Sequence, residues 1–176
     1  MNQKEIIEKL ETSHREFSHF IMSLNDAQLT TAPEGKWKPI QHLDHICRSV
    51  GAVSQALMLP KIVIRLVVGI SNRPSKSYDA LVEKYKSKLN QGGKAKGRFV
   101  PGSANPASKN NLSDKMENSV RKLCRRLLSY SEDQLDYYIL PHPLLGKLTM
   151  REMLYFTIYH AEHHRNLIQK DQVDVS

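Results

Sequence analysis

The sequence predicts an all-α protein: a four-helix bundle with one or two short extra helices and a long basic insert. Apolar residues recur three, four and seven positions apart along most of the chain, which is the period of amphipathic helices. The alternation of apolar and polar residues that marks half-buried strands is almost absent. Four long amphipathic segments bury their apolar stripes by packing against one another, which is the arrangement of a helical bundle.

The first two long helices are expected at Gln3–Leu24 and Pro39–Leu59. The apolar stripe of the first follows the helical spacing and comprises Ile6, Leu10, Phe17, Phe20, Ile21 and Leu24. Pro39 suits the first turn of the second helix, where the missing N–H of a proline leaves no bond unmade. Pro60 marks the expected end of that helix.

The middle of the chain, from Lys61 to Asn111, is the least regular part. Tyr78–Leu89 is expected to form a short helix. The run GGKAKGRFVPGSANPASKNN that follows is rich in Gly, Pro, Ser and Asn, the composition of a long loop. Loops of this length in a small domain usually serve a function or stay disordered.

The third long helix is expected at Asp114–Leu128, with Ser113 as its N-cap. Its buried stripe should contain Met116, Val120, Leu123, Leu127 and Leu128. Ser131 and the acidic residues after it have the character of the first turn of a short helix that ends near Tyr138.

The final long helix is expected at Met150–Lys170. Thr149, followed three residues later by Glu152, fits a capping box at its start. The preceding run ILPHPLLGKLT is expected to be a connector.

Length and composition fit one soluble domain, residues 1–176, large enough to bury a core without disulfides or a structural metal. Cys47 and Cys124 lie outside any Cys-x-x-Cys pattern, so small buried side chains are expected at both positions. The amino terminus lacks a signal-type apolar run. The longest apolar stretch, Ile62–Ile70, contains Arg65 and is far shorter than the ~20 residues of a membrane span. A cytoplasmic protein without a membrane segment is expected.

The net charge of +8 is concentrated in one segment. Lys61 to Arg98 contains ten Lys or Arg against Asp79 and Glu83, whereas the rest of the chain has sixteen residues of each sign. A basic excess confined to one segment indicates a solvated insert or a lid over a site. Nucleic acid is not the expected partner, because aromatic residues that would stack on bases are sparse there.

Histidines supply the main functional signal. His160 and His164 are four residues apart, so both project from one face of the final helix and can hold one metal ion. A buried pair of imidazoles needs hydrogen bonds or a metal, although such a pair also arises by chance. His45 shares a helix face with His42 and the small residues Ser49, Ala52 and Ala56. This face leaves space beside the imidazole, simply permits close helix packing, or lies on the surface.

These motifs make the sequence similar to the DinB/YfiT-like superfamily of helical-bundle, metal-dependent enzymes. In that family the second helix opens with Trp-x-Pro and carries a His six residues past the Pro, as at Trp37, Pro39 and His45. The last helix carries two His separated by three residues, as at His160 and His164, and then a polar-apolar run that often ends in Gln-Ile; here the order is Ile168, Gln169. The connector also resembles the family's lead into that helix, with His142, Pro143, Gly146 and Thr149.

The resemblance implies a three-histidine site for a divalent transition metal, Zn²⁺ or Ni²⁺, held by His45, His160 and His164. Three protein ligands leave an open position, as in a catalytic zinc site. Characterised relatives include transferases and isomerases that use low-molecular-weight thiols. The resemblance therefore implies a thiol-dependent S-transferase or a hydrolase with a small-molecule substrate, and bundles of this family frequently form homodimers.

Two further residues are candidates for a part in the chemistry. Gln41 lies one helical turn before His45 and is expected to reach the metal or its water. His142, in the connector, would act as an acid or base or would bond a backbone group, the structural role being favoured. Asp44 and Glu162 neighbour the proposed ligands in sequence but point away from them, so both are expected to be surface charges.

Other residues of the same types are expected to have structural roles. His163 should lie off the interior face of its helix, and His14 and His19 should be exposed. Packing roles are expected for Trp37, Tyr137 and Tyr138 and for the methionines Met22, Met58, Met116, Met150 and Met153.

Two other functions stay open from the sequence. The bundle could be a non-catalytic protein that binds an acidic partner or nucleic acid through the basic segment Lys61–Arg98. It could also be a structural homodimer in which the histidines are only buried polar groups.

Overall fold

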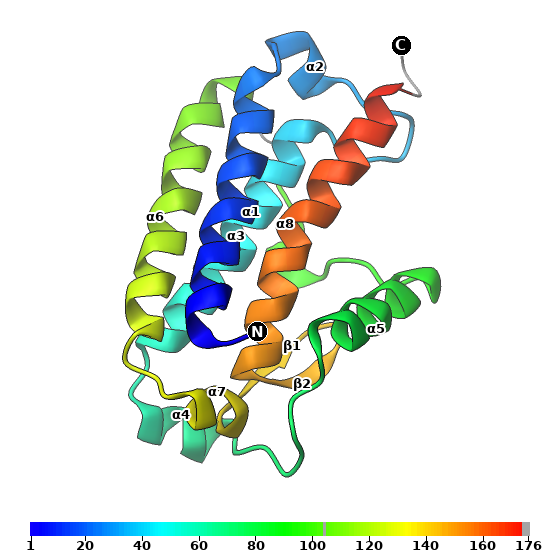
Figure 1. Ribbon diagram of the computed structural model, residues 1–176. Coiled ribbons are helices and arrows are strands. Elements are labelled where there is room, and N and C mark those ends of the chain that lie inside the picture. Colours follow the sequence, from blue (N-terminus) through cyan, green and yellow to red (C-terminus); the bar gives the residue numbers. More distant parts are fainter. Residues whose placement is uncertain (104, 174–176) are drawn as a thin grey trace.

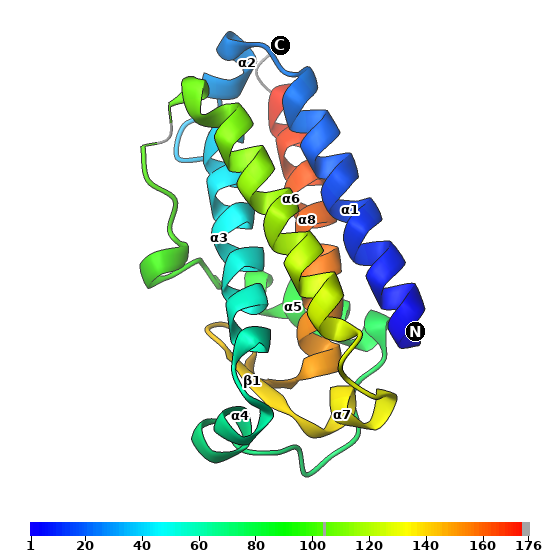
Figure 2. The same ribbon diagram turned by 90° about the vertical axis from the view of Figure 1, so that its left-hand side faces the viewer.

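Four long helices lie side by side in the computed structural model (Figure 1), which describes residues 1–103 and 105–173. They are α1 (Gln3–Ser23), α3 (Pro39–Met58), α6 (Lys109–Leu127) and α8 (Met150–Val173). Helices α1 and α8 run upward in Figure 1 and α3 and α6 run downward, and α3 packs against both α6 and α8. The view turned by 90° shows the same bundle (Figure 2), so the predicted fold class is confirmed.

Local capping explains where the helices begin. Asn2 accepts a hydrogen bond from the backbone N–H of Glu5, and the Glu5 carboxylate accepts one from the backbone N–H of Asn2. The same reciprocal pair opens α8, as predicted: Thr149 Oγ1 accepts from the N–H of Glu152, whose carboxylate accepts from the N–H of Thr149. Pro39 occupies the first turn of α3, also as predicted.

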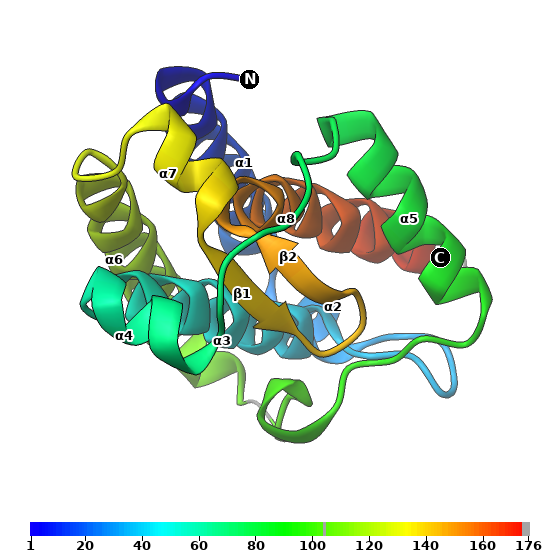
Figure 3. The same ribbon diagram turned by 90° about the horizontal axis from the view of Figure 1, so that it is seen from below.

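Shorter elements surround the bundle. Within the described residues they are α2 (Asp26–Thr30), α4 (Lys61–Val67), α5 (Tyr78–Asn90), α7 (Glu132–Tyr137) and the 3-10 turns η1 (Gly97–Phe99) and η2 (Pro106–Ser108). Helices α4 and α7 and the strands lie at the lower end of the bundle (Figure 3), α5 lies along one side, and α2 lies at the upper end in Figure 1. Helix α5 packs against α8, while α7 contacts both α8 and β2 (Gly146–Thr149). The basic segment 61–98 is thus largely helical, and α5 is the short helix expected there.

The connector before α8 is a β-hairpin, which the sequence did not predict. Strand β1 (Ile139–His142) pairs antiparallel with β2, and the register joins Ile139 to Thr149 and His142 to Gly146. Gly146 has φ of 77°, a conformation that glycine adopts without strain. Strands of four residues are too short to show a clear alternation of apolar and polar positions.

Helix α6 begins five residues earlier than predicted. Ser113 is not its N-cap but lies buried inside the helix, where its Oγ is 2.6 Å from the Oγ of Ser18 on α1. The polar first turn after Ser108 carries no apolar stripe, so periodicity could not find it. The predicted stripe of α6 is buried except for Leu128, which is 69% exposed.

The remaining core predictions were right in part. Met116, Met150 and Met153 are buried, as are the free thiols Cys47 and Cys124. Met22 and Met58 are exposed instead, because each lies at the last turn of its helix, beyond the packed faces. Among the described residues no single helix is long and apolar enough to cross a bilayer; α3 and α4 reach that length only as a pair bent by 106°.

One buried carboxylate ties the segment before α5 to α8. Glu152 is fully buried and accepts hydrogen bonds from both terminal nitrogens of Arg73, at 2.6 and 2.7 Å. It also accepts one from the backbone N–H of Lys76, at 2.9 Å. These bonds hold the pKa of Glu152 below its usual value against the opposing effect of burial. They fix the chain that leads into α5 against the foot of α8.

Candidate metal centre

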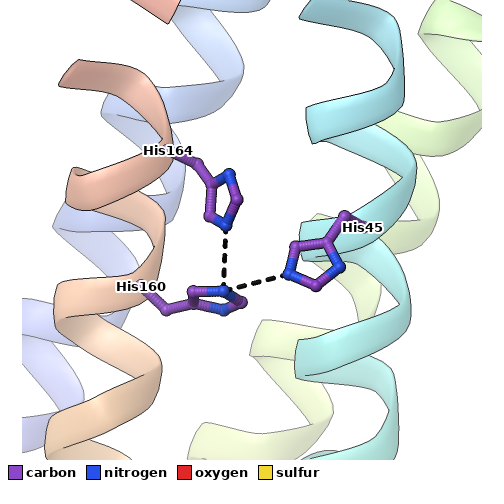
Figure 4. Close-up of side chains that lie close together, drawn as sticks. All are labelled: His45, His160 and His164. Atoms are coloured by element: carbon purple, nitrogen blue, oxygen red, sulfur yellow. Dashed lines mark hydrogen bonds between the residues drawn. The ribbon is translucent and has the colours of Figure 1, made fainter. Parts of the chain in front are cut away.

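Three histidines converge between α3 and α8 (Figure 4). One ring nitrogen from each of His45, His160 and His164 lies within 4.8 Å of the others. The Nε2 atom of His160 is 3.1 Å from the Nε2 of His45 and 3.0 Å from the Nε2 of His164. The structure therefore brings together all three residues that the sequence analysis named as metal ligands.

Burial keeps these imidazoles neutral. Each of the three residues is 5% exposed. Removal from water disfavours the charged imidazolium, and it lowers the pKa of His160 and of His164 well below 6.5. The pKa of His45 is lowered by burial too, although its bond to a backbone carbonyl works in the opposite direction. Neutral imidazoles have the free lone pairs that a metal requires.

The tautomer of His45 follows from its other ring nitrogen. Nδ1 of His45 lies 2.6 Å from the carbonyl oxygen of Phe99, in η1. Because a carbonyl oxygen only accepts, Nδ1 carries the proton and donates it, which leaves a lone pair on Nε2. Metal-bound histidines in proteins are held by the same kind of bond. The loop containing Phe99 thus orients His45 toward the other two histidines.

The separations fit a transition-metal ion. Two zinc–nitrogen bonds of about 2.0–2.1 Å at a tetrahedral angle place their nitrogens roughly 3.3 Å apart. The separations of 3.0 and 3.1 Å around His160 are close to this value. Three imidazole donors suit Zn²⁺, Ni²⁺ and iron more than Mg²⁺ or Ca²⁺, which prefer oxygen ligands. The donor set fits a divalent transition metal and does not identify which one.

A fourth histidine contacts the cluster through the second ring nitrogen of His164. Nδ1 of His42, one turn before His45 on α3, lies 2.6 Å from Nδ1 of His164. Because His164 directs Nε2 toward His160, its Nδ1 is free to donate a proton to His42. Burial lowers the pKa of His42 to about 3, so this ring stays neutral and can accept. The sequence analysis missed this role, although the spacing of His42 and His45 places both on one helix face.

Aromatic rings close the site on two sides. Trp37 is stacked at 10° on the ring of His164, with centroids 6.2 Å apart, and its ring lies 5.0 Å from that of His45. Phe156 stacks on His160 with centroids 4.6 Å apart. Tyr85, from α5, approaches His160 edge-on at 6.2 Å. Trp37 has the packing role that was expected, and its partners are the histidine rings of the cluster.

Loop 98–102 is fastened to α3 by side chains for which the sequence suggested other roles. Gln41 does not reach the cluster: its amide nitrogen donates to the carbonyl of Gly102, and its oxygen accepts from the N–H of Lys38 at the helix start. Asp44 is 8% exposed rather than a surface charge, and it accepts from Arg48 and from the N–H of Gly102. Both predictions failed because they did not include the loop at Gly102, which covers these two side chains.

His142 has the structural role that the sequence analysis favoured. Its Nδ1 accepts from the backbone N–H groups of Leu144 and Leu145, at 3.1 and 3.0 Å, and so shapes the hairpin turn. These bonds place the ring proton on Nε2. Burial lowers the pKa of His142 to about 4, so the ring is neutral near pH 7 and is not an acid there.

The exposure predicted for the other histidines was right in part. His19 is exposed, as expected, and His163 lies at the flank of α8 against the ring of Tyr85. His14 was expected to be exposed but is buried, and its Nδ1 donates to the carbonyl of Leu10 one turn earlier. Glu162 is half-buried and accepts a bond from the hydroxyl of Tyr78.

A cavity of about 180 Å³ opens beside the cluster. His45 and His160 form part of its wall, and further residues of α3 and α8, with α5, loop 94–99 and the hairpin, supply the rest. The cluster therefore borders a cavity through the rings of His45 and His160.

Comparison with known proteins agrees with this description. The family model of the DinB superfamily matches residues 9–168. The chain belongs to the DinB superfamily. The crystal structure of TT2238, described as a four-helix bundle protein, matches with a TM-score of 0.60 over 96% of this chain and 98% of the other, at 16% identity. That likeness shows the fold alone, and no curated protein matches the sequence. Superfamily membership and the buried three-histidine cluster are compatible with a metal-dependent enzyme.

Proposed function

We propose that this DinB-superfamily protein is a metal-dependent enzyme that acts on a small molecule. His45, His160 and His164 are the proposed ligands of one divalent ion, Zn²⁺ or Ni²⁺. The observation that carries the proposal is the convergence of three buried, neutral imidazoles on one point beside a cavity. Without a metal, one N–H on Nε2 of His160 would have to serve the Nε2 lone pairs of both His45 and His164, whereas a metal ion would bind all three lone pairs.

The leading reaction is thiol-dependent S-transfer, and hydrolysis is the second. When bound, a divalent ion supplies Lewis acidity that lowers the pKa of a water or thiol, so that hydroxide or thiolate is available near neutral pH. Three histidine ligands leave room for one such small ligand. The thiol reaction is favoured by the resemblance to relatives that use low-molecular-weight thiols, and it stays a proposal for this chain.

The protein's own residues would orient the metal ligands and exclude water from the site. The carbonyl of Phe99 holds the Nδ1 proton of His45, and His42 holds that of His164, so both rings present Nε2 lone pairs. The rings of Trp37 and Phe156 cover the cluster and limit the access of water. A neutral His142 offers an Nε2–H donor in the cavity wall, where it could hold a substrate oxygen.

The test is a metal-dependent thiol assay. Full-length protein, untagged, is loaded with Zn²⁺ or Ni²⁺ and mixed with glutathione, cysteine or coenzyme A and the electrophile 1-chloro-2,4-dinitrobenzene; p-nitrophenyl acetate tests hydrolysis. We expect product formation that requires metal, is lost in His160→Ala and is kept in His19→Ala, whose histidine is exposed. Equal rates for His160→Ala and wild type, in either reaction, would contradict the proposal.

A further inference from the structure

The cavity beside the cluster has two chemically distinct parts. Its inner wall is largely apolar, formed by side chains such as Val53, Leu140, Met153 and Phe156. On α3 the small residues Ala52 and Ala56 face this space and leave it open. Apolar walls of this kind favour a ligand with an apolar body, because burial of apolar surface is worth about 25 cal/mol per Å².

Two cations contribute to the lining of this cavity. Lys94 and Arg98 both line it and are both exposed to solvent. Its lining contains no Asp or Glu. Across the described residues neither cation forms an ion pair, whereas Arg48 pairs with Asp44 and Arg73 with Glu152. The charges of Lys94 and Arg98 are therefore not neutralised by an ion pair within that part of the chain.

The backbone that carries these cations is held in place. The carbonyl oxygen of Arg98 accepts a hydrogen bond from the guanidinium of Arg48, and that of Phe99 accepts one from His45. The guanidinium of Arg98 lies 5.1 Å from the ring of Phe99, which restricts its rotation. Earlier in the loop, Gly93 packs so closely on Leu144 of the hairpin that a β-carbon there would lie 2.6 Å from that side chain. Both ends of the segment are thus fixed to the bundle.

We propose that this cavity binds a small organic anion with an apolar body, such as an aliphatic or aromatic carboxylate. The charged group lies between Lys94 and Arg98, and the apolar body extends along Ala52 and Ala56 toward His160. This names the substrate class of the proposed enzyme and in that respect rests on the proposed function. Binding itself needs only the cavity and the two cations, so it can be measured without a metal.

Isothermal titration calorimetry of metal-free, full-length protein with sodium octanoate tests the proposal. Octylamine and octan-1-ol, with the same chain length, carry a positive charge and no charge. We expect octanoate to bind more tightly than octan-1-ol and octylamine to bind weakest. Octyl phosphate, a second source of negative charge, should bind at least as well as octanoate. Binding of octylamine equal to that of octanoate, or binding of no probe, would overturn the proposal.

Variants separate the two parts of the cavity. Exposed charge pairs are worth about 0.2–1 kcal/mol each, so Lys94→Gln with Arg98→Gln should weaken octanoate binding about two- to thirtyfold and remove its salt dependence. Lys96→Gln, an exposed cation of the same loop that does not line the cavity, is the control and should change nothing. Ala56→Phe fills the apolar part and should abolish binding, with circular dichroism to confirm folding. A double variant that behaves like Lys96→Gln, or binding that survives in Ala56→Phe, would overturn the inference.

A zinc titration of the same samples keeps the two proposals apart. Octanoate bound as expected by a protein that never takes up metal would leave the anion site standing and remove the proposed metalloenzyme. Metal uptake without octanoate binding would leave the proposed metal site standing and remove the anion site.

Discussion

His42 should control the metal affinity of the cluster without being one of its ligands. Its Nδ1 lies 2.6 Å from Nδ1 of His164, and both rings are buried. In His42→Ala the Nδ1 proton of His164 loses its acceptor, and an unsatisfied buried donor costs about 1–3 kcal/mol. At 1.4 kcal/mol per factor of ten, this cost corresponds to an affinity loss of roughly 5- to 150-fold. Removal of such supporting partners elsewhere typically costs about 10- to 100-fold.

The assay is a competition for Zn²⁺ between the protein and a chromophoric chelator at constant pH. We expect His42→Ala to weaken Zn²⁺ binding about 10- to 100-fold and His164→Ala to weaken it further. His42→Gln keeps an acceptor oxygen and should recover part of the loss. His19→Ala, an exposed histidine on α1, is the matched control and should bind like wild type.

Two results would refute this reasoning. A His42→Ala protein within about twofold of wild type would show that His164 does not depend on the bond. A His42→Ala loss as large as that of His164→Ala, with no recovery in His42→Gln, would instead make His42 a ligand. Thermal unfolding of each variant shows whether the fold has survived.

Three further predictions concern the fold around the site. The pKa of buried His14 is lowered from 6.5 to about 4, so the unfolded chain takes up a proton first. The free energy of unfolding should therefore have its full value above pH 6.5 and should decrease as the pH falls toward 4. The urea midpoint of His14→Leu should decrease less than that of the wild type over this range. An equal decrease in both proteins would show that His14 is not the cause. Glu152→Ala should destabilise the protein by about 2–3 kcal/mol, which is less than the loss from breaking a fully buried ion pair, because Arg73 is partly exposed. A loss of less than about 0.5 kcal/mol in urea titrations would contradict this prediction. Gly93→Ala places a β-carbon 2.6 Å from the Lys88 carbonyl, so it should cost about 1–3 kcal/mol and raise amide exchange in loop 94–99; unchanged exchange would argue against the close packing.

The bundle could be predicted from sequence because its signals are local. Periodicity identified the four long helices, and capping patterns such as Thr149 with Glu152 located a helix start. The spacing of His160 and His164 placed them on one face, and the structure brings His45 to them from α3. The helices, the cap and the His160–His164 pair depend on residues within a turn or two of one another, which is the range that sequence patterns report. His45 was added as a ligand by the family resemblance.

The failures arose where a distant segment decides the environment. Asp44 and Gln41 were assigned without the loop that covers them, because nothing local indicates that Gly102 returns to α3. A packing role was expected for Trp37, but its partners, the histidine rings, follow only from the arrangement of α3 and α8. Helix α4 and the hairpin were missed because short elements carry too few periods to recognise.

The central claim is that the three histidines hold a metal. It is tested most directly by elemental mass spectrometry of protein purified without a histidine tag, beside the His160→Ala, His164→Ala double variant. We predict about one equivalent of a divalent transition metal in the wild type and none in the double variant. A wild type that stays free of metal after Zn²⁺ and Ni²⁺ are added back, or a double variant that retains the same metal content, would contradict the claim.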